Sequence, residues 1–178
     1  MAKESKTIFD RNVIDFVTVA AEFCKLMEQA VVTEKDQFVD TTLKVLPLLY
    51  IKALLLPACE PMGNELLEEH VTEEDYEYIR TNIARILTKD DVYLDVFMED
   101  MKYSDTPVRR CISEDLADIY QALRNFVESY KSGLDDVMAE SVAVCAEGFR
   151  TYWGQTLANT MRAVHNVRYG VDLDPDYE

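Results

Sequence analysis

Three pairs of acidic residues stand three positions apart in this sequence, a spacing that puts both carboxylates on one face of a helix. Carboxylates on helices can hold magnesium for the hydrolysis of phosphate esters. The pairs are Glu65 with Glu68, Glu74 with Glu77, and Asp115 with Asp118. With 34 acids in 178 positions, about six such pairs are expected by chance. The spacing alone therefore predicts no metal site.

Histidine and cysteine are too sparse for most metal and nucleophilic sites. The two histidines, His70 and His165, lack the Glu-x-x-His spacing of di-iron bundles. The four cysteines never come closer than 34 positions, which excludes the CxxC pattern of zinc and redox sites. No glycine-rich phosphate loop and no nucleophile elbow is present. We therefore predict no catalytic residue, no metal and no cofactor.

The step Trp153-Gly154 is the most informative local signal. Glycine costs about 1 kcal/mol relative to alanine inside a helix, so Gly148 and Gly154 need a structural reason. Close packing of a neighbouring segment is the favoured interpretation, and a ligand pocket is the alternative. The residues of that alternative ligand site are Tyr120, Phe149, Tyr152, Trp153, Gly154, Asp115 and Asp118.

Helical periodicity predicts the elements that position these residues. Helix starts are indicated near Thr7, Thr33, Thr72 and Ser113, each with an acidic residue in the first turn. A longer last helix carries an apolar stripe from residue 138 to 164, and a short helix is expected over 65–70. The sequence thus predicts an all-α bundle of five main helices plus a short one. It forms a single domain over residues 1–170, followed by a flexible acidic tail over 171–178.

Two segments carry more specific expectations. Pro47 lies inside the second helix and predicts a kink. The apolar run 48–51 predicts that this helix is central and buried on most sides. Residues 89–107 are expected to be irregular or partly extended, because apolar residues alternate with other residues from Val92 onward.

The charge balance excludes several partners. The chain has 18 basic and 34 acidic residues, a net charge of −16, which opposes binding to nucleic acid and to an anionic membrane. The longest apolar stretch, 43–56, contains two lysines and is too short to cross a bilayer. The first residues show no apolar leader, so the cytoplasm is the expected compartment.

The acidic residues are concentrated in one part of the chain. Residues 60–105 hold 14 acidic and 4 basic residues. Such a run usually forms a solvated face that keeps the protein soluble, and less often a docking surface for a basic partner. The leading hypothesis is a non-catalytic module that binds another protein through Glu73, Glu74, Asp91 and Asp95. The alternative is a small-ligand-binding protein or metal-dependent hydrolase with carboxylates near the Trp-Gly step. The chain is expected to be a monomer or a weak homodimer.

Two motifs carry a family resemblance. The first is Ser-Glu-Asp-Leu-Ala-Asp-Ile-Tyr-Gln-Ala-Leu over residues 113–123, and the second is Tyr152-Trp153-Gly154 in the last helix. Together they resemble an uncharacterised bacterial domain-of-unknown-function family of small, acidic, all-helical proteins. The resemblance implies a helical fold in the cytoplasm and leaves the activity open.

Overall fold

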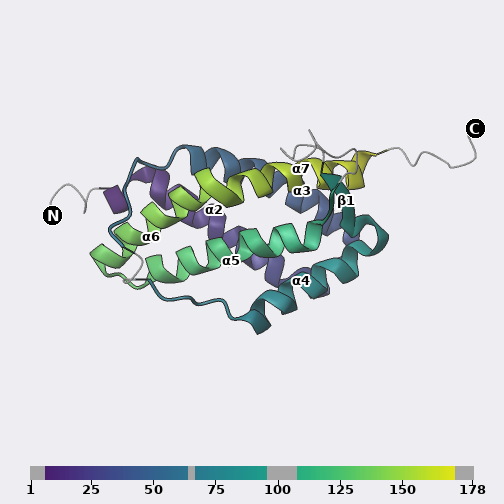
Figure 1. Cartoon of the computed structure of the whole chain (residues 1–178), viewed down its shortest axis with the longest axis horizontal. Coiled ribbons are helices and arrows are strands. Elements are labelled where there is room, and N and C mark those ends of the chain that lie inside the picture. The colour runs from purple at the N-terminus through teal and green to yellow at the C-terminus, as the bar shows by residue number, and fades with distance from the viewer. Residues whose placement is uncertain (1–6, 64–66, 96–107, 171–178) are drawn as a thin grey trace, which may run out of the picture.

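The computed structural model describes residues 7–63, 67–95 and 108–170, and it is mostly helical (Figure 1). The helical class predicted from the periodicity is confirmed. The main elements in chain order are α2 (Arg11–Glu28), α3 (Lys35–Leu54), α4 (Glu73–Leu87), β1 (Val92–Asp95), β2 (Val108–Cys111), α5 (Ile112–Lys131), α6 (Asp135–Gly148) and α7 (Gly154–Tyr169).

Helix α5 is the centre of the bundle. It packs against α2, α4, α6 and α7, and Figure 1 shows it between α6 and α4. Its inward face is apolar, with Leu116, Ile119 and Leu123 fully shielded from solvent. Phe16 of α2 lies against Phe126 of α5, with ring centroids 5.2 Å apart. The core therefore forms around the helix that also carries Asp115 and Asp118.

The start of α4 is the predicted one. The Thr72 hydroxyl accepts a hydrogen bond from the Asp75 backbone N–H at 3.1 Å, and the Asp75 carboxylate accepts one from the Thr72 N–H at 3.0 Å. This reciprocal arrangement is a capping box, which satisfies two otherwise unpaired donors. The sequence predicts this helix start correctly because the two residues of the capping box, Thr72 and Asp75, are only three positions apart.

The other predicted starts are shifted. Helix α2 begins at Arg11, because Asp10 rather than Thr7 accepts from the Asn12 N–H at 2.8 Å. Helix α3 follows Glu34, while the Thr33 hydroxyl donates to a carbonyl of the preceding turn. In each case a second polar residue close by offers an alternative helix start.

Helix α3 is peripheral, so the prediction of a central second helix is wrong. It packs against α2 and α7, and its outer face is open to solvent. The run 48–51 places apolar side chains all round the helix, but only part of that surface has a neighbour. Pro47 lies inside α3 as predicted, and the helix continues to Leu54. The apolar side chains of the outer face are between 44% and 60% exposed: Leu48, Ile51, Leu54 and Leu55.

Residues 92–95 and 108–111 pair as two short antiparallel strands, with Val92 opposite Cys111 and Asp95 opposite Val108. The extended structure predicted from Val92 onward is confirmed for β1. The remainder of that prediction, over residues 96–107, lies outside the described residues, as does the predicted tail over 171–178.

No helix forms over the described part of the predicted short helix 65–70. Residues 67–70 have no regular structure. The backbone N–H groups of His70 and Val71 donate to the side-chain oxygen of Asn125 on α5, at 2.7 and 3.0 Å. A long-range partner therefore satisfies donors that the sequence pattern had assigned to a local helix.

The long C-terminal helix is present, with a π-helical segment over Phe149–Trp153 between α6 and α7. The Gly154 N–H donates to the carbonyl of Phe149, five residues earlier, as a π turn requires. A Cβ atom at Gly154 would lie 2.4 Å from that carbonyl oxygen and 2.8 Å from the Phe149 ring. The glycine is thus explained by close approach of the preceding turn. None of the helices in the described part of the chain has the length and apolar content of a membrane span.

Candidate functional site

Trp153 belongs to the core. It is 1% exposed, and its ring lies against Phe16 and Phe149, with centroids 6.3 and 4.8 Å away. Its indole N–H donates to the Cys145 carbonyl at 3.1 Å. A buried tryptophan with its one donor satisfied is well suited to a packing role. One edge of the ring nevertheless reaches a cavity described below.

Asp115 is a buried carboxylate at the junction of β2, α5 and α7. It is 2% exposed and accepts hydrogen bonds from Arg110 at 2.7 Å, Tyr93 at 2.5 Å and Thr160 at 3.3 Å. Burial raises the pKa of this carboxyl, while Tyr93 and Arg110 act in the opposite direction. The carboxylate holds together elements that are distant in the sequence.

Asp118, one turn further along α5, is bonded by two phenols. It accepts from Tyr76 of α4 at 2.8 Å and from Tyr152 of the π-helical segment at 2.5 Å. Burial, reinforced by the bond to Asp118, raises the pKa of Tyr152 to about 12. Both phenols are therefore protonated donors at neutral pH, so Asp118 ties α4 to the last helix.

The pair Asp115 and Asp118 does not resemble a metal centre. Both carboxylates are already engaged by neighbouring donors, which a cation would have to displace. Across residues 7–63, 67–95 and 108–170, no three His, Cys, Asp or Glu side chains are arranged to hold a metal ion. This geometry gives the two carboxylates positioning roles between elements.

Two of the four residues predicted for a partner surface are buried, which corrects that prediction. Asp91 is 7% exposed and accepts from the backbone N–H and the hydroxyl of Ser113, both at 2.7 Å. Asp95 is 3% exposed and lies 3.9 Å from the guanidinium of Arg110. An acidic run is usually solvated, but the turn before β1 directs Asp91 inward and the end of β1 directs Asp95 inward. The hydrogen bonds between Ser113 and Asp91 also show that Ser113, which was expected to cap α5, donates its hydroxyl to Asp91 instead.

Glu73 and Glu74 are exposed at the start of α4, and further acids lie beside them. We call this set the acidic face. Residues 67–79 contain six acids and no lysine or arginine. All six are exposed: Glu68, Glu69, Glu73, Glu74, Asp75 and Glu77.

A groove of about 480 Å³ lies beside the acidic face, between α2, α4 and α5. It contains Tyr120, whose hydroxyl donates to Glu28 at 3.0 Å. Arg124 lies 3.4 Å from Glu28 and 3.1 Å from Glu128. Tyr120 therefore serves this groove and does not lie with Trp153. Tyr120, Arg124 and Glu128 are spaced by four residues, which places them on one face of α5. This spacing is the sequence signal that could have located the groove.

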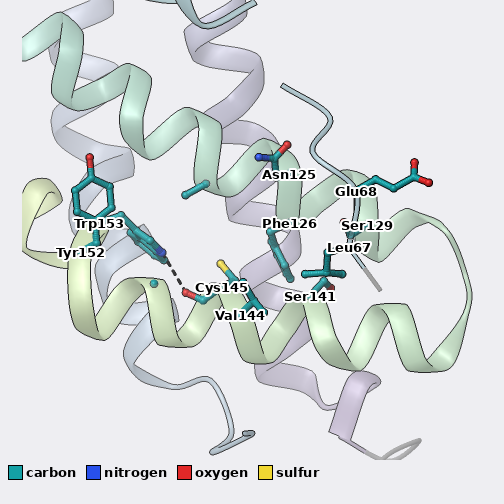
Figure 2. A pocket seen from close by; sticks show the side chains of 12 residues that line it. Leu67, Glu68, Asn125, Phe126, Ser129, Ser141, Val144, Cys145, Tyr152 and Trp153 are labelled. Carbon is teal, nitrogen blue, oxygen red and sulfur yellow. Dashed lines mark hydrogen bonds between the residues drawn. The ribbon is translucent and has the colours of Figure 1, made fainter. Parts of the chain in front are cut away.

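A second cavity of about 220 Å³ lies between α5 and α6, next to the segment that contains Leu67 and Glu68 (Figure 2). Tyr152 and Trp153 line it, as the pocket hypothesis expected, but Phe149 and Gly154 do not. The predicted ligand-binding residues therefore do not form one site. Tyr120 lies in the groove, Tyr152 and Trp153 line this cavity, and the carboxylates of Asp115 and Asp118 bond to other elements of the fold. The residues that sequence reasoning missed lie on the other walls of this cavity, among them Asn125, Ser129 and Ser141.

Comparison with known proteins agrees with the resemblance seen in the two motifs. Residues 7–170 match a domain of unknown function, DUF5063. The fold is similar to the crystal structure of protein BF1032 from Bacteroides fragilis, with 49% sequence identity and a TM-score of 0.84. The match covers 94% of this chain and 99% of that one. No curated protein matches the sequence. The chain belongs to the DUF5063 family, a family of unknown function.

Proposed function

We propose that this protein is a non-catalytic module that binds a basic segment of another protein along the acidic face. The observation that supports this most is the run of six exposed acids in 13 consecutive residues without a lysine or arginine. Such a surface attracts cationic partners and accelerates their association.

Several buried acids and the acids of the acidic face differ in what engages them. The buried carboxylates Asp91, Asp95 and Asp115 are used inside the fold, whereas most of the acidic face has no internal use. Glu77 pairs with Arg80 at 2.7 Å, and Asp75 completes the capping box. In the part of the chain that the structure describes, no ion pair or hydrogen bond engages the side chains of the other four: Glu68, Glu69, Glu73 and Glu74.

The groove next to the acidic face supports the same function. Its wall holds Asp75 and the rings of Tyr78 and Tyr120. It also holds Glu28 and Glu128, whose carboxylates are paired with Arg124 of the same wall. A lysine or arginine side chain can place its charge beside carboxylates and its stem against aromatic rings. One basic side chain of the partner would enter the groove, while its neighbours contact Glu73 and Glu74.

Two further properties belong to this proposal. We place the protein in the cytoplasm, since all four cysteines are free thiols and disulfides are rare in that compartment. We also propose that it acts as a monomer or weak homodimer, with the exposed face of α3 as the surface for any self-association.

The experiment is a quantitative affinity capture from a lysate at low salt with three immobilised proteins. The first is the natural chain, and the second carries Glu73→Lys and Glu74→Lys. The third carries Asp135→Lys and Asp136→Lys, a matched control because this pair is also exposed, acidic and in the first turn of a helix. Both variants change the net charge by the same amount and lose similar interactions with a helix dipole.

We expect one specific protein to be recovered by the natural chain and by the control, and about tenfold less by the Glu73/Glu74 variant. Its recovery should also fall in about 1 M salt, where the Debye length is about 3 Å. Equal losses in both variants would show that total charge decides the binding, and equal recovery in all three would reject the acidic face.

A further inference from the structure

The cavity between α5 and α6 has an apolar wall and almost no charge. Among the lining residues that the structure describes, only Glu68 is charged, and it is exposed. Figure 2 shows Leu67, Phe126 and Val144 around the cavity, with Trp153 and its bond to Cys145 at one end. This composition is typical of sites for small uncharged molecules.

Two polar side chains in this wall have groups without a partner. Ser129 is 4% exposed, and its hydroxyl makes no hydrogen bond to any residue that the structure describes. The Asn125 side-chain oxygen accepts from the His70 and Val71 backbone, which identifies the other end of the amide as its nitrogen. That nitrogen also has no partner in the described part of the chain.

Asn125 and Ser129 are four residues apart on α5, so their side chains lie on the same face of the helix. Neither donor atom is among the fully shielded side-chain atoms without a partner in the described residues, which are those of Thr42 and Arg162. Both donors therefore remain accessible, and a bound molecule with a hydrogen-bond acceptor can reach them from the cavity.

The size of the cavity limits the occupant. A cavity of about 150 Å³ with an apolar wall is known to bind benzene, so about 220 Å³ accommodates one ring with a small substituent. We infer that this cavity binds an uncharged, ring-sized molecule whose single polar group accepts hydrogen bonds from Asn125 and Ser129. The site goes beyond the proposed function, and of its lining residues that the structure describes only Glu68 also belongs to the acidic face.

Three probes of nearly equal size test this assignment: benzamide, toluene and benzoate. Binding is measured by titration of protein NMR shifts, which also locate the probe. We expect benzamide to bind with a Kd of about 1 mM or lower and toluene about fivefold more weakly, because it cannot accept a hydrogen bond. Benzoate should bind at least tenfold more weakly than benzamide, because an anion would lie near Glu68 in a protein of net charge −16.

The variant Ser129→Ala removes the hydroxyl without breaking any hydrogen bond of the fold. It should weaken benzamide about fivefold and leave toluene unchanged. Thr42→Val is the matched control, because Thr42 is also buried with a hydroxyl that has no partner, but it does not line the cavity. Both variants should unfold at the same or a slightly higher temperature than the natural chain, and only Ser129→Ala should alter benzamide binding.

Ala122→Leu provides a second test, since a larger side chain on this wall would occupy the space of the ring. It should abolish the binding of all three probes while far-UV circular dichroism stays unchanged. The Glu73/Glu74 variant should bind benzamide normally, which separates this result from that of the capture experiment. The inference is rejected if no probe shifts the signals of the cavity residues, if benzamide and toluene bind equally, or if Ser129→Ala and Thr42→Val behave alike.

Discussion

Arg110 and Asp115 lie 2.7 Å apart where strand β2 passes into helix α5, and the two differ in their access to water. The side chain of Asp115 is 2% exposed and that of Arg110 is 31% exposed. Removing either partner therefore has unequal consequences. A solvated arginine tolerates the loss of its carboxylate, whereas a buried carboxylate that loses its cation keeps the cost of desolvation with only the neutral donors Tyr93 and Thr160 to offset it.

Arg110→Met should lower the free energy of unfolding by about 3 kcal/mol, and Asp115→Asn by about half of that. The double variant should lose less than the sum, because it removes the buried charge of Asp115 together with its cationic partner. Urea denaturation of the four proteins measures this cycle. Burial raises the pKa of Asp115, and loss of Arg110 should raise it further. In acid the carboxyl is therefore protonated and uncharged in the variant, so the difference in unfolding free energy between Arg110→Met and the natural chain should become smaller. Simple additivity would contradict a direct interaction.

Gly154→Ala should be destabilising although alanine is the better helix former. The added methyl group would lie 2.4 Å from the Phe149 carbonyl oxygen, so the π turn has to shift. We expect a loss of about 2 kcal/mol in the free energy of unfolding, measured by urea denaturation. Gly148→Ala is the matched control, because its Cβ would lie 3.2 Å from the Trp153 ring, a contact that small movements relieve. Equal effects at both glycines would contradict the role of the π turn.

The four thiols should divide into two classes of reactivity. Cys24 and Cys145 are buried, and burial raises the pKa of Cys24 to about 12. Cys59 and Cys111 are partly exposed. Because the thiolate is the reactive species, iodoacetamide at about pH 8 should label the second pair in the native protein and the first pair only in denaturant. Peptide mass spectrometry reads the sites, and early labelling of Cys145 would show that the cavity wall opens.

The capping box of α4 should contribute to the acid sensitivity of the protein. Hydrogen bonds from the Thr72 hydroxyl and backbone hold the pKa of Asp75 below its ordinary value of 3.8. A lowered carboxyl pKa stabilises the fold above the ordinary value, and this stability is lost as the pH falls through the folded value. Asp75→Asn should therefore flatten the decline in unfolding free energy between about pH 5 and pH 3. Urea denaturation at each pH measures this decline. If Asp75→Asn leaves it unchanged, the capping box does not contribute to the acid sensitivity.

Local signals in the sequence predicted local structure well. The capping box at Thr72, the extended residues after Val92 and the helical stripe across the π-helical segment all follow from residues a few positions apart. The family resemblance also rested on short motifs, and it is confirmed. These features could be read from the chain because their partners are close in sequence.

The features that the sequence did not predict depend on distant partners. The apolar run of α3 indicates burial, but whether a helix face is covered depends on which neighbours reach it. Asp91 and Asp95 lie in an acidic segment that suggests solvation, and their burial depends on Ser113 and Arg110. The segment around His70 is fixed by Asn125, more than 50 positions away. Tyr120 and Trp153 belong to the same predicted site, but Tyr120 lines the groove beside Glu28, whereas Trp153 packs in the core against Phe16.

The π turn at Phe149–Trp153 also determines which side of α7 faces the core. An α-helix turns by about 100° for each residue, so deleting one residue from this segment would restore a regular ladder while rotating α7 as a whole. Leu157 would leave the interior and the hydroxyl of Thr160 would turn away from Asp115. The one extra residue of the π turn thus determines how far α7 is rotated about the helix axis relative to α6.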